Sequence, residues 1–162
     1  MFEELLGKQL EVVYAVAVTD GVNQYTLDDT LVFRLSDERM YQLLVAQVEK
    51  TLREMHDKAD VVLWGEYEPE LQIVLETTEA EPVLPEGGLF IGEIREYWAD
   101  DGKHEFLMGV VFADPGSGNE LSILTGGTEA EIVTPDLFME VIREMSFPCR
   151  VVRHPPPSST EG

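Results

Sequence analysis

Short apolar runs separated by glycine- and proline-containing turns recur along the chain, and this alternation constrains its fold more than any other feature. The first run, residues 10–18, is rich in valine and stops at Asp20-Gly21, a pair that tolerates the positive φ of a tight hairpin turn. Asp101-Gly102 and residues 114–119 supply similar turns later. Connections this short join antiparallel strands, so the sequence predicts a series of β-hairpins. The predicted strands are residues 10–18, 30–35, 59–65, 71–77, 89–98, 106–113, 121–124, 130–133 and 150–153.

Two stretches have apolar side chains at helical spacing. The first predicts a helix over residues 47–56, with residues 40–45 either its beginning or a separate strand. The second predicts a helix from Pro135 to Met145, because Thr134 can cap its first turn. The predicted fold class is therefore α+β, mainly an antiparallel sheet of hairpins with two amphipathic helices. The apolar stripe of the first helix consists of Leu44, Val48, Leu52 and Met55.

The two halves of the chain resemble each other at an offset of half its length, where glycines, Asp-Gly pairs and valine-rich runs coincide. This predicts a first β-rich half with a helix at residues 1–81, a linker or long loop at 82–88 and a second such half at 89–153. The alternative is one compact domain over residues 1–153. Residues 154–162 are rich in proline and serine and are predicted to form a disordered tail.

The net charge of −21, from 32 acidic and 11 basic residues, excludes several classes of partner. Nucleic acid and anionic membrane surfaces repel such a chain unless it has a strongly basic patch, and the sequence has none. Because 44% of the residues are hydrophobic, the chain is also too apolar for a disordered acidic tail. The negative charge is therefore expected on a folded surface, where it favours a basic protein partner.

Cysteine content and the N-terminal segment bear on the compartment. Cys149 is the only cysteine, so no intrachain disulfide can form and a reducing compartment fits. Residues 1–7 lack the basic start and apolar core of a signal peptide, and the longest unbroken apolar run is residues 12–18. We expect a cytoplasmic protein that does not enter a membrane.

One acidic turn combines a histidine with carboxylates, which is a donor set that divalent metals accept. Asp100, Asp101, His104 and Glu105 lie together around the predicted hairpin turn. The competing interpretation is that Asp101 and Gly102 serve turn geometry alone. No other pattern predicts catalytic residues, and no cofactor is expected.

Aromatic side chains next to carboxylates form the second candidate site, because tyrosine and tryptophan dominate contact energy at protein interfaces. Adjacent strand residues face opposite ways, so one of Tyr97 and Trp98 is expected in the core and the other on the surface. The competing interpretation is that Trp64, like one of Tyr97 and Trp98, is simply a core residue. The predicted partner-binding residues are Trp64, Glu66, Tyr67, Glu68, Glu70, Tyr97, Trp98, Asp100 and Asp101.

These observations lead to two functional hypotheses. The first is a non-enzymatic acidic interaction protein that binds a basic protein, as an inhibitor, an antitoxin or immunity type of protein, or a mimic of nucleic acid. The alternative is an enzyme that binds a small molecule or a divalent cation at the site around residues 100–105. The absence of a recognisable catalytic motif favours the first hypothesis.

Overall fold

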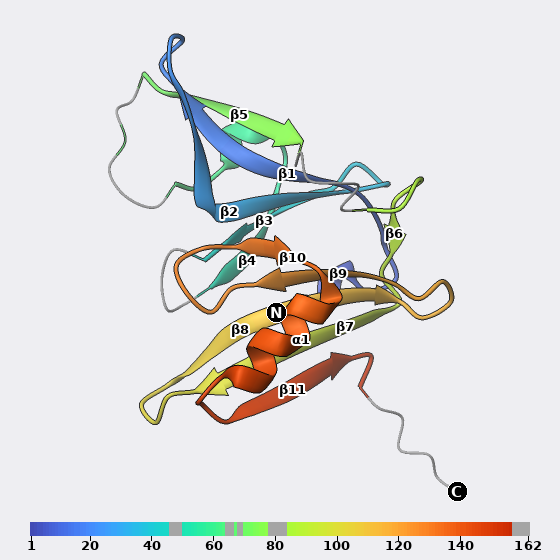
Figure 1. The fold of residues 1–162 in the computed structure, drawn as a ribbon. Coiled ribbons are helices and arrows are strands. Elements are labelled where there is room, and N and C mark those ends of the chain that lie inside the picture. Colours follow the sequence, from blue (N-terminus) through green and yellow to red (C-terminus); the bar gives the residue numbers. More distant parts are fainter. Residues whose placement is uncertain (46–49, 64–66, 68–69, 78–83, 157–162) are drawn as a thin grey trace, which may run out of the picture.

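Two antiparallel β-sheets pack face to face in a computed structural model that describes residues 1–45, 50–63, 67, 70–77 and 84–156 (Figure 1). The strand order is β4-β3-β2-β1-β5 in the first sheet, where β6 also pairs with β1, and β10-β9-β8-β7-β11 in the second. The first sheet contains β1 (Gln9–Thr19), β2 (Gln24–Leu35), β3 (Met40–Leu44), β4 (Thr51–Met55), β5 (Gln72–Thr77) and β6 (Leu89–Phe90). The second contains β7 (Glu93–Asp100), β8 (Glu105–Asp114), β9 (Asn119–Leu124), β10 (Glu131–Val133) and β11 (Cys149–His154). The helices are η1 (Glu3–Leu5), η2 (Lys58–Asp60) and α1 (Pro135–Glu144).

The predicted hairpins are present, and two of them turn in the same way. Asp20 Oδ1 accepts hydrogen bonds from the backbone N–H groups of Val22 and Asn23, both at 2.8 Å. Asp101 Oδ1 likewise accepts from the backbone N–H groups two and three residues later, at 2.8 and 3.0 Å. The glycine after each aspartate has a positive φ, near +95° at Gly21. The Asp-Gly pairs thus make these turns by the chemistry expected of them.

The prediction of a helix over residues 47–56 is wrong. Residues 51–55 form β4, which pairs with β3, and residues 46–49 lie outside the described residues. Leu52 contacts the core between the sheets, whereas Met55 lies in the cluster on the outer face of the first sheet. Their spacing of three matches one helix face, but in a strand it puts the two side chains on opposite faces. Pairing with β3 decides the outcome.

The predicted strand at residues 59–65 is not formed over its described part. Residues 58–60 are η2, and residues 61–63 form no strand but cross the outer face of the first sheet. The buried Gln42 side chain holds this segment, because its Nε2 donates to the Val62 carbonyl at 2.7 Å and its Oε1 accepts from the Val62 N–H at 2.9 Å. The segment therefore covers the sheet and does not extend it.

The C-terminal helix is confirmed. Thr134 Oγ1 accepts the Leu137 N–H at 3.2 Å, and Pro135 occupies the first turn, as predicted. Phe138 buries its ring against Gly109, where an added Cβ would lie 2.4 Å from Phe138 Cε2. The missing side chain of Gly109 thus lets α1 lie close to the second sheet. Among the described residues, no helix is long and apolar enough to cross a membrane.

The two sheets share one apolar core. Phe112 of β8 lies at its centre, with its ring edge-on to Phe2 at 5.6 Å and to Phe33 at 5.5 Å between centroids. Smaller clusters lie on the outer faces. Tyr97 and Phe138 belong to the cluster under α1, and Val16 to the one under residues 61–63. The core residues between the sheets are Phe2, Leu5, Leu10, Val13, Leu31, Phe33, Leu35, Tyr41, Leu43, Val45, Leu89, Ile91, Ile94, Leu107, Val110, Phe112, Leu121 and Ile123.

The five-strand paths of the two sheets follow the chain in the same order. Each is a four-stranded meander whose fifth strand returns beside its first, as Figure 1 shows for β5 beside β1 and β11 beside β7. The pairing registers correspond as well, since Val13 pairs with Phe33 and Ile94 with Phe112. This is the arrangement that an internal duplication would produce, and the duplication itself stays a prediction.

We expect Phe112→Ala to lower the free energy of unfolding by about 4 kcal/mol, because it leaves a cavity between the sheets. Urea denaturation followed by circular dichroism would measure the change. Val22→Ala is the control, since Val22 is 89% exposed and its truncation should cost less than about 0.5 kcal/mol. Equal effects of the two substitutions would contradict the shared core.

Candidate functional site

Tyr97, one of the predicted partner-binding residues, is only 5% exposed. Its ring lies edge-on to Phe138 of α1 at 5.1 Å, and its hydroxyl donates to Met139 Sδ at 3.8 Å. Tyr97 is thus the core member of the Tyr97–Trp98 pair, and Trp98 is the partly exposed one. The other sheet covers one face of this strand and α1 covers the other.

Trp98 is half-buried against the core between the sheets, and its Nε1 donates to Glu96 Oε1 at 3.0 Å. The Arg150 guanidinium lies over its ring, 5.9 Å from the centroid. Of the other aromatic candidates, Tyr67 and the nearby Glu70 are exposed. Trp64, Glu66 and Glu68 lie outside the described residues.

The acidic turn at residues 100–105 does not bring its candidate ligands together. Asp101 Oδ2 lies 3.5 Å from His104 Nε2, but Asp100 Oδ1 accepts the backbone N–H of Gly102 at 2.8 Å. Glu105 is bound by both arms of the Arg150 guanidinium, at 2.6 and 2.9 Å. This contact lowers the pKa of the Glu105 carboxyl, and backbone N–H donors lower the pKa of Asp101. The residues are engaged in turn geometry and an ion pair.

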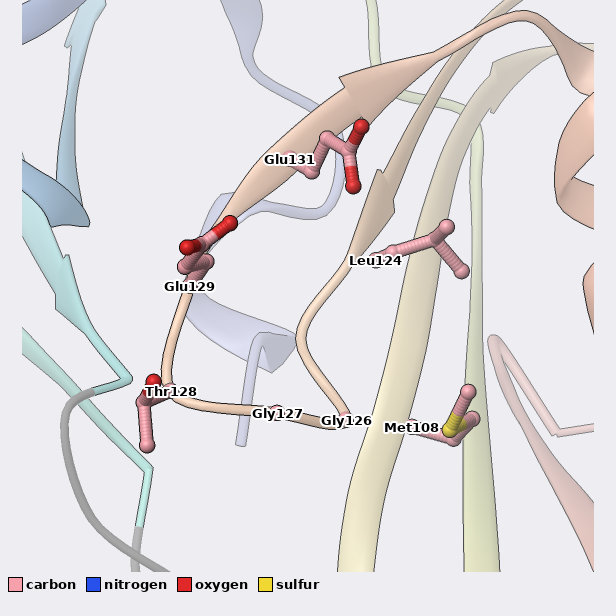
Figure 2. A pocket seen from close by; sticks show the side chains of 7 residues that line it. All are labelled: Met108, Leu124, Gly126, Gly127, Thr128, Glu129 and Glu131. Carbon is pink, nitrogen blue, oxygen red and sulfur yellow. The ribbon is translucent and has the colours of Figure 1, made fainter.

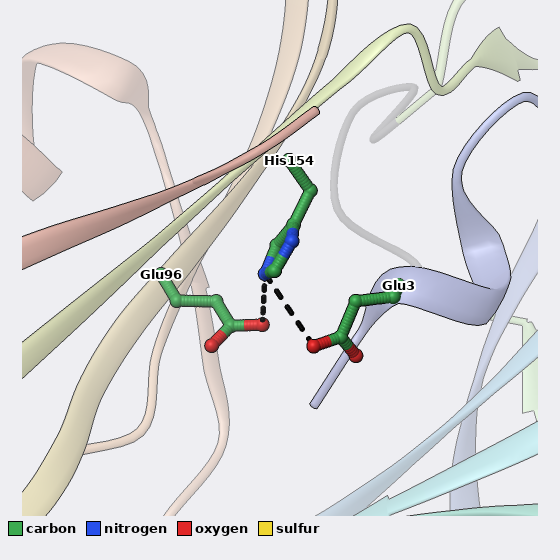
Figure 3. A group of neighbouring side chains, drawn as sticks. All are labelled: Glu3, Glu96 and His154. Carbon is green, nitrogen blue, oxygen red and sulfur yellow. Dashed lines mark hydrogen bonds and ion pairs between the residues drawn. The ribbon is translucent and has the colours of Figure 1, made fainter. Parts of the chain in front are cut away.

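A different histidine joins two carboxylates, as Figure 3 shows. His154 Nε2 lies 3.1 Å from Glu96 Oε2 and 3.8 Å from Glu3 Oε1. The Met1 ammonium contacts both carboxylates, at 2.9 Å from Glu3 Oε2 and 3.1 Å from Glu96 Oε2, and the Phe2 N–H donates to Glu96 at 3.1 Å. Among the described residues, this is the one group of three potential metal ligands that the structure brings together.

The cluster depends on contacts between three distant segments. Glu3 lies on η1, Glu96 on β7, and His154 at the end of β11, where the sequence analysis placed the start of a disordered tail. Glu96 is buried on the inward side of β7, beside the core. No local pattern identifies the group, because its members are far apart in the sequence.

A second group of charges lies where the two sheets meet. We define the acidic junction as Asp28, Asp29, Glu129 and Glu131. Asp28 and Asp29 lie in an irregularity of β2, where residues 28–30 have no partner on β1. The Asp28 carbonyl accepts the N–H of Ala130 at 2.8 Å, which ties this irregularity to the loop between β9 and β10. Glu129 of that loop thereby comes next to Asp28, and Glu131 and Asp29 lie beside them on their own segments.

The carboxylates of the acidic junction repel one another, and this repulsion changes their pKa values. The charge of Asp28 and a hydrogen bond with it raise the pKa of the Glu129 carboxyl. Burial and then the charge of Asp28 raise the pKa of Asp29, whose Oδ1 is buried with no hydrogen-bond partner among the described residues. Burial raises the pKa of the neighbouring Tyr67 phenol, and the charges of Asp29 and Asp28 raise it further. Within the described part of the chain, no Lys or Arg forms an ion pair with these carboxylates.

A hollow of about 250 Å³ opens beside the acidic junction (Figure 2). Met108 of β8 and Leu124 of β9 supply its apolar wall, and Glu129 and Glu131 supply its carboxylates. The loop between them is held in place by the buried Lys50, whose Nζ donates to the Gly127 carbonyl at 2.9 Å. The remaining lining residues are Gly126, Gly127 and Thr128.

A second hollow, of about 390 Å³, also contacts Met108. Val141, Met145 and Phe147 give it an apolar lining at the C-terminal end of α1, and Glu144 adds a carboxylate. Met108 thus separates two hollows that each combine apolar side chains with negative charge. Comparisons with protein-family models, curated proteins and solved structures find no match to this chain.

We expect Asp28→Asn to lower the pKa of Glu129 toward its ordinary value, because the substitution removes the neighbouring charge. A carbon-detected NMR titration of the glutamate carboxyls would measure this. A carboxyl with a raised folded-state pKa stabilises the fold fully below its unfolded pKa of 4.5, and the contribution is lost as the pH rises through the folded pKa. The contribution of Glu129 to the unfolding free energy should therefore fall as the pH rises above that value, and the difference in unfolding free energy between the wild type and Asp28→Asn should show it.

Asp20→Asn is the matched control for this titration, since Asp20 lies in the hairpin turn and does not affect the Glu129 carboxyl. If Glu129 titrates identically in the wild type and in the Asp28→Asn variant, the two carboxyls are not neighbours and the acidic junction is not assembled.

Proposed function

We propose that the protein is a non-enzymatic interaction protein that binds a basic protein partner at the acidic junction. The observation that carries this proposal is a set of four neighbouring carboxylates that form no ion pair with a Lys or Arg among the described residues. Like charges held together without compensation favour a cation that arrives from outside. The net charge of −21 steers such a partner toward the protein.

The ion pairs that Lys and Arg form among the described residues are with other carboxylates. Arg95 contacts Glu93 at 2.6 Å and Glu120 at 2.9 Å, and Arg150 holds Glu105. These contacts neutralise the flank of the second sheet around β7 and β11, away from the acidic junction. Within the part of the chain that the structure describes, carboxylates near β7 and β11 are paired with arginines, whereas those of the acidic junction are not. The acidic junction therefore differs from the rest of the acidic surface. The other ion pairs of Lys and Arg are Lys8–Asp37, Arg34–Glu11, Arg39–Asp37 and Arg153–Glu93.

The hollow beside the acidic junction suits the side chain of a lysine or an arginine. Such a side chain has an aliphatic stem and a charged end. The stem would pack on Met108 and Leu124, and the charged end would meet Glu129 and Glu131. Charge-assisted hydrogen bonds of this kind are about twice as strong as neutral ones. The hollow thus supports a basic partner and gives no reason to assign a reaction.

An inhibitor, an antitoxin or immunity type of protein, or a mimic of nucleic acid fits this proposal, since each binds a basic protein surface. We place the protein in the cytoplasm, because its single cysteine, Cys149, is exposed and free, and an exposed thiol persists in a reducing compartment.

We further propose that the two halves arose by internal duplication. Supporting this, Gln9 pairs with Phe90 and Leu10 with Leu89 where β1 meets β6. A shift by half the chain length takes position 9 to position 90, and the reverse shift takes position 90 to position 9. The pair Gln9–Phe90 therefore maps onto itself with its members exchanged, as a two-fold relation between the halves requires. The common strand order of the two sheets supports the same proposal.

We expect Glu129→Gln/Glu131→Gln to weaken binding of a fluorescently labelled hexa-arginine peptide at least tenfold at 0.1 M salt. The substitutions remove both carboxylates of the hollow while keeping side-chain size, and fluorescence anisotropy would measure the dissociation constant. Glu38→Gln/Glu86→Gln is the matched control, because both residues are exposed and the net charge changes equally. Equal losses in the two double variants would show diffuse attraction and contradict the site.

A basic protein captured by the full chain from its own cell extract should be released when the salt is raised from 0.1 to 0.5 M. The screening length falls from about 10 Å to about 4 Å over this range, which weakens attraction between exposed charges. Mass spectrometry of the captured fraction, compared with that of the Glu129→Gln/Glu131→Gln variant, would measure the effect. The proposal fails if the captured proteins are not basic, or if the same ones stay bound at both salt concentrations and to both variants.

A further inference from the structure

We propose that Glu3, Glu96 and His154 bind a divalent transition-metal ion such as zinc. The inference is independent of the basic partner, because this cluster lies on the side of β7 that faces η1 and not at the acidic junction. Figure 3 shows the three side chains converging from three different segments of the chain.

The spacing of the donor atoms fits a small ion. Metal–ligand bonds of about 2.1 Å in a tetrahedral site place the ligand atoms about 3.4 Å apart. His154 Nε2 lies 3.1 Å from Glu96 Oε2 and 3.8 Å from Glu3 Oε1, which are values on either side of that distance. All three donor atoms lie within 4.8 Å of one another. Small adjustments of side-chain torsions suffice to bring them to a common ion.

Burial and charge favour a cation at this position. The side chain of Glu96 is 3% exposed and that of His154 is 13% exposed, whereas Glu3 is 57% exposed and leaves a route from solvent. A carboxylate as buried as Glu96 requires a positive charge or strong hydrogen-bond donors beside it. The Met1 ammonium supplies that charge in the absence of an ion, since it touches both carboxylates.

A bound metal ion would take over from this ammonium the role of neutralising Glu3 and Glu96. A water molecule can serve as the fourth ligand next to the three side chains. The ammonium touches both carboxylates and must move aside when an ion binds between them. The Phe2 N–H and Trp98 Nε1 donate to Glu96 and hold its carboxylate in place.

The donor set discriminates between metals. One imidazole and two carboxylates suit zinc, cobalt and related ions, whereas calcium and magnesium prefer oxygen ligands alone and in greater number. The chain also contains a natural comparison, because His104 and Asp101 form a partly exposed imidazole–carboxylate pair at 3.5 Å, with no third ligand among the described residues. Within the part of the chain that the structure describes, only the cluster around Glu96 offers three ligands.

The test is a titration of the purified full chain with Co²⁺, followed by visible absorption, since cobalt bound by nitrogen and oxygen donors at a protein site has a distinctive spectrum. We expect ligand-field bands that saturate at one ion per chain and disappear when Zn²⁺ is added. Zn²⁺ affinity, measured by calorimetry, should fall at least tenfold in His154→Gln and in Glu3→Gln. His104→Gln is the matched control and should bind as the wild type does.

Thermal unfolding without metal establishes that each variant is folded. Glu3→Gln keeps the test decisive if His154→Gln does not fold, because the exposed Glu3 side chain can be changed without opening the core. The absence of cobalt bands in the wild type would overturn the proposal. An unchanged affinity in Glu3→Gln, or a loss in His104→Gln that equals the losses in the other variants, would overturn it as well.

Discussion

Both sheets have two apolar faces, and the need to cover all four of them determines the rest of the structure. The inner faces cover each other around Phe112. Each outer face is covered by the segment that follows the fourth strand of its sheet, which is α1 in the second sheet and includes residues 58–63 in the first. A segment that starts at the β4 or β10 edge and crosses the sheet arrives at the opposite edge. The fifth strand therefore pairs with the first strand, and the order 4-3-2-1-5 follows twice.

Turns and capping act between residues close in sequence, so the hairpins and α1 can be predicted locally. The prediction fails at residues 51–55, because helical spacing in a short stretch is outweighed by pairing with β3. At Tyr97, strand alternation gives the two faces of β7 correctly, but it does not reveal that α1 covers one of them. The cluster at Glu96 and the acidic junction join segments up to a whole chain length apart. Only the packing of the sheets creates them, so neither leaves a local pattern.

The packing of the two sheets distributes the charged side chains unevenly over the protein. Most described arginines form ion pairs with carboxylates, which offsets part of the negative charge in those regions. The acidic junction is different, because the backbone contact between Asp28 and Ala130 forces acidic residues of both sheets together. Its repulsion is a cost that the shared core outweighs. Binding of a cation at this exposed position reduces the repulsion between the carboxylates. The packing of the sheets is thereby linked to the proposed function.

The acidic junction and its hollow lie at register shifts in corresponding places of the two sheets, where three residues of β2 have no partner on β1 and one residue of β8 has none on β7. The register of β1 with β2 shifts between Ala15 and Val16, and that of β7 with β8 shifts at Tyr97, half a chain later. The carbonyl at each irregularity accepts an N–H from the residue after the third strand, Asp29 from Val45 and Met108 from Thr125. Equivalent backbone positions thus carry an aspartate in one half and a methionine in the other. If the halves share an origin, their divergence at this one position left a charged side chain on β2, next to Asp28 of the acidic junction, and an apolar wall of the hollow on β8. A lysine or arginine side chain needs both.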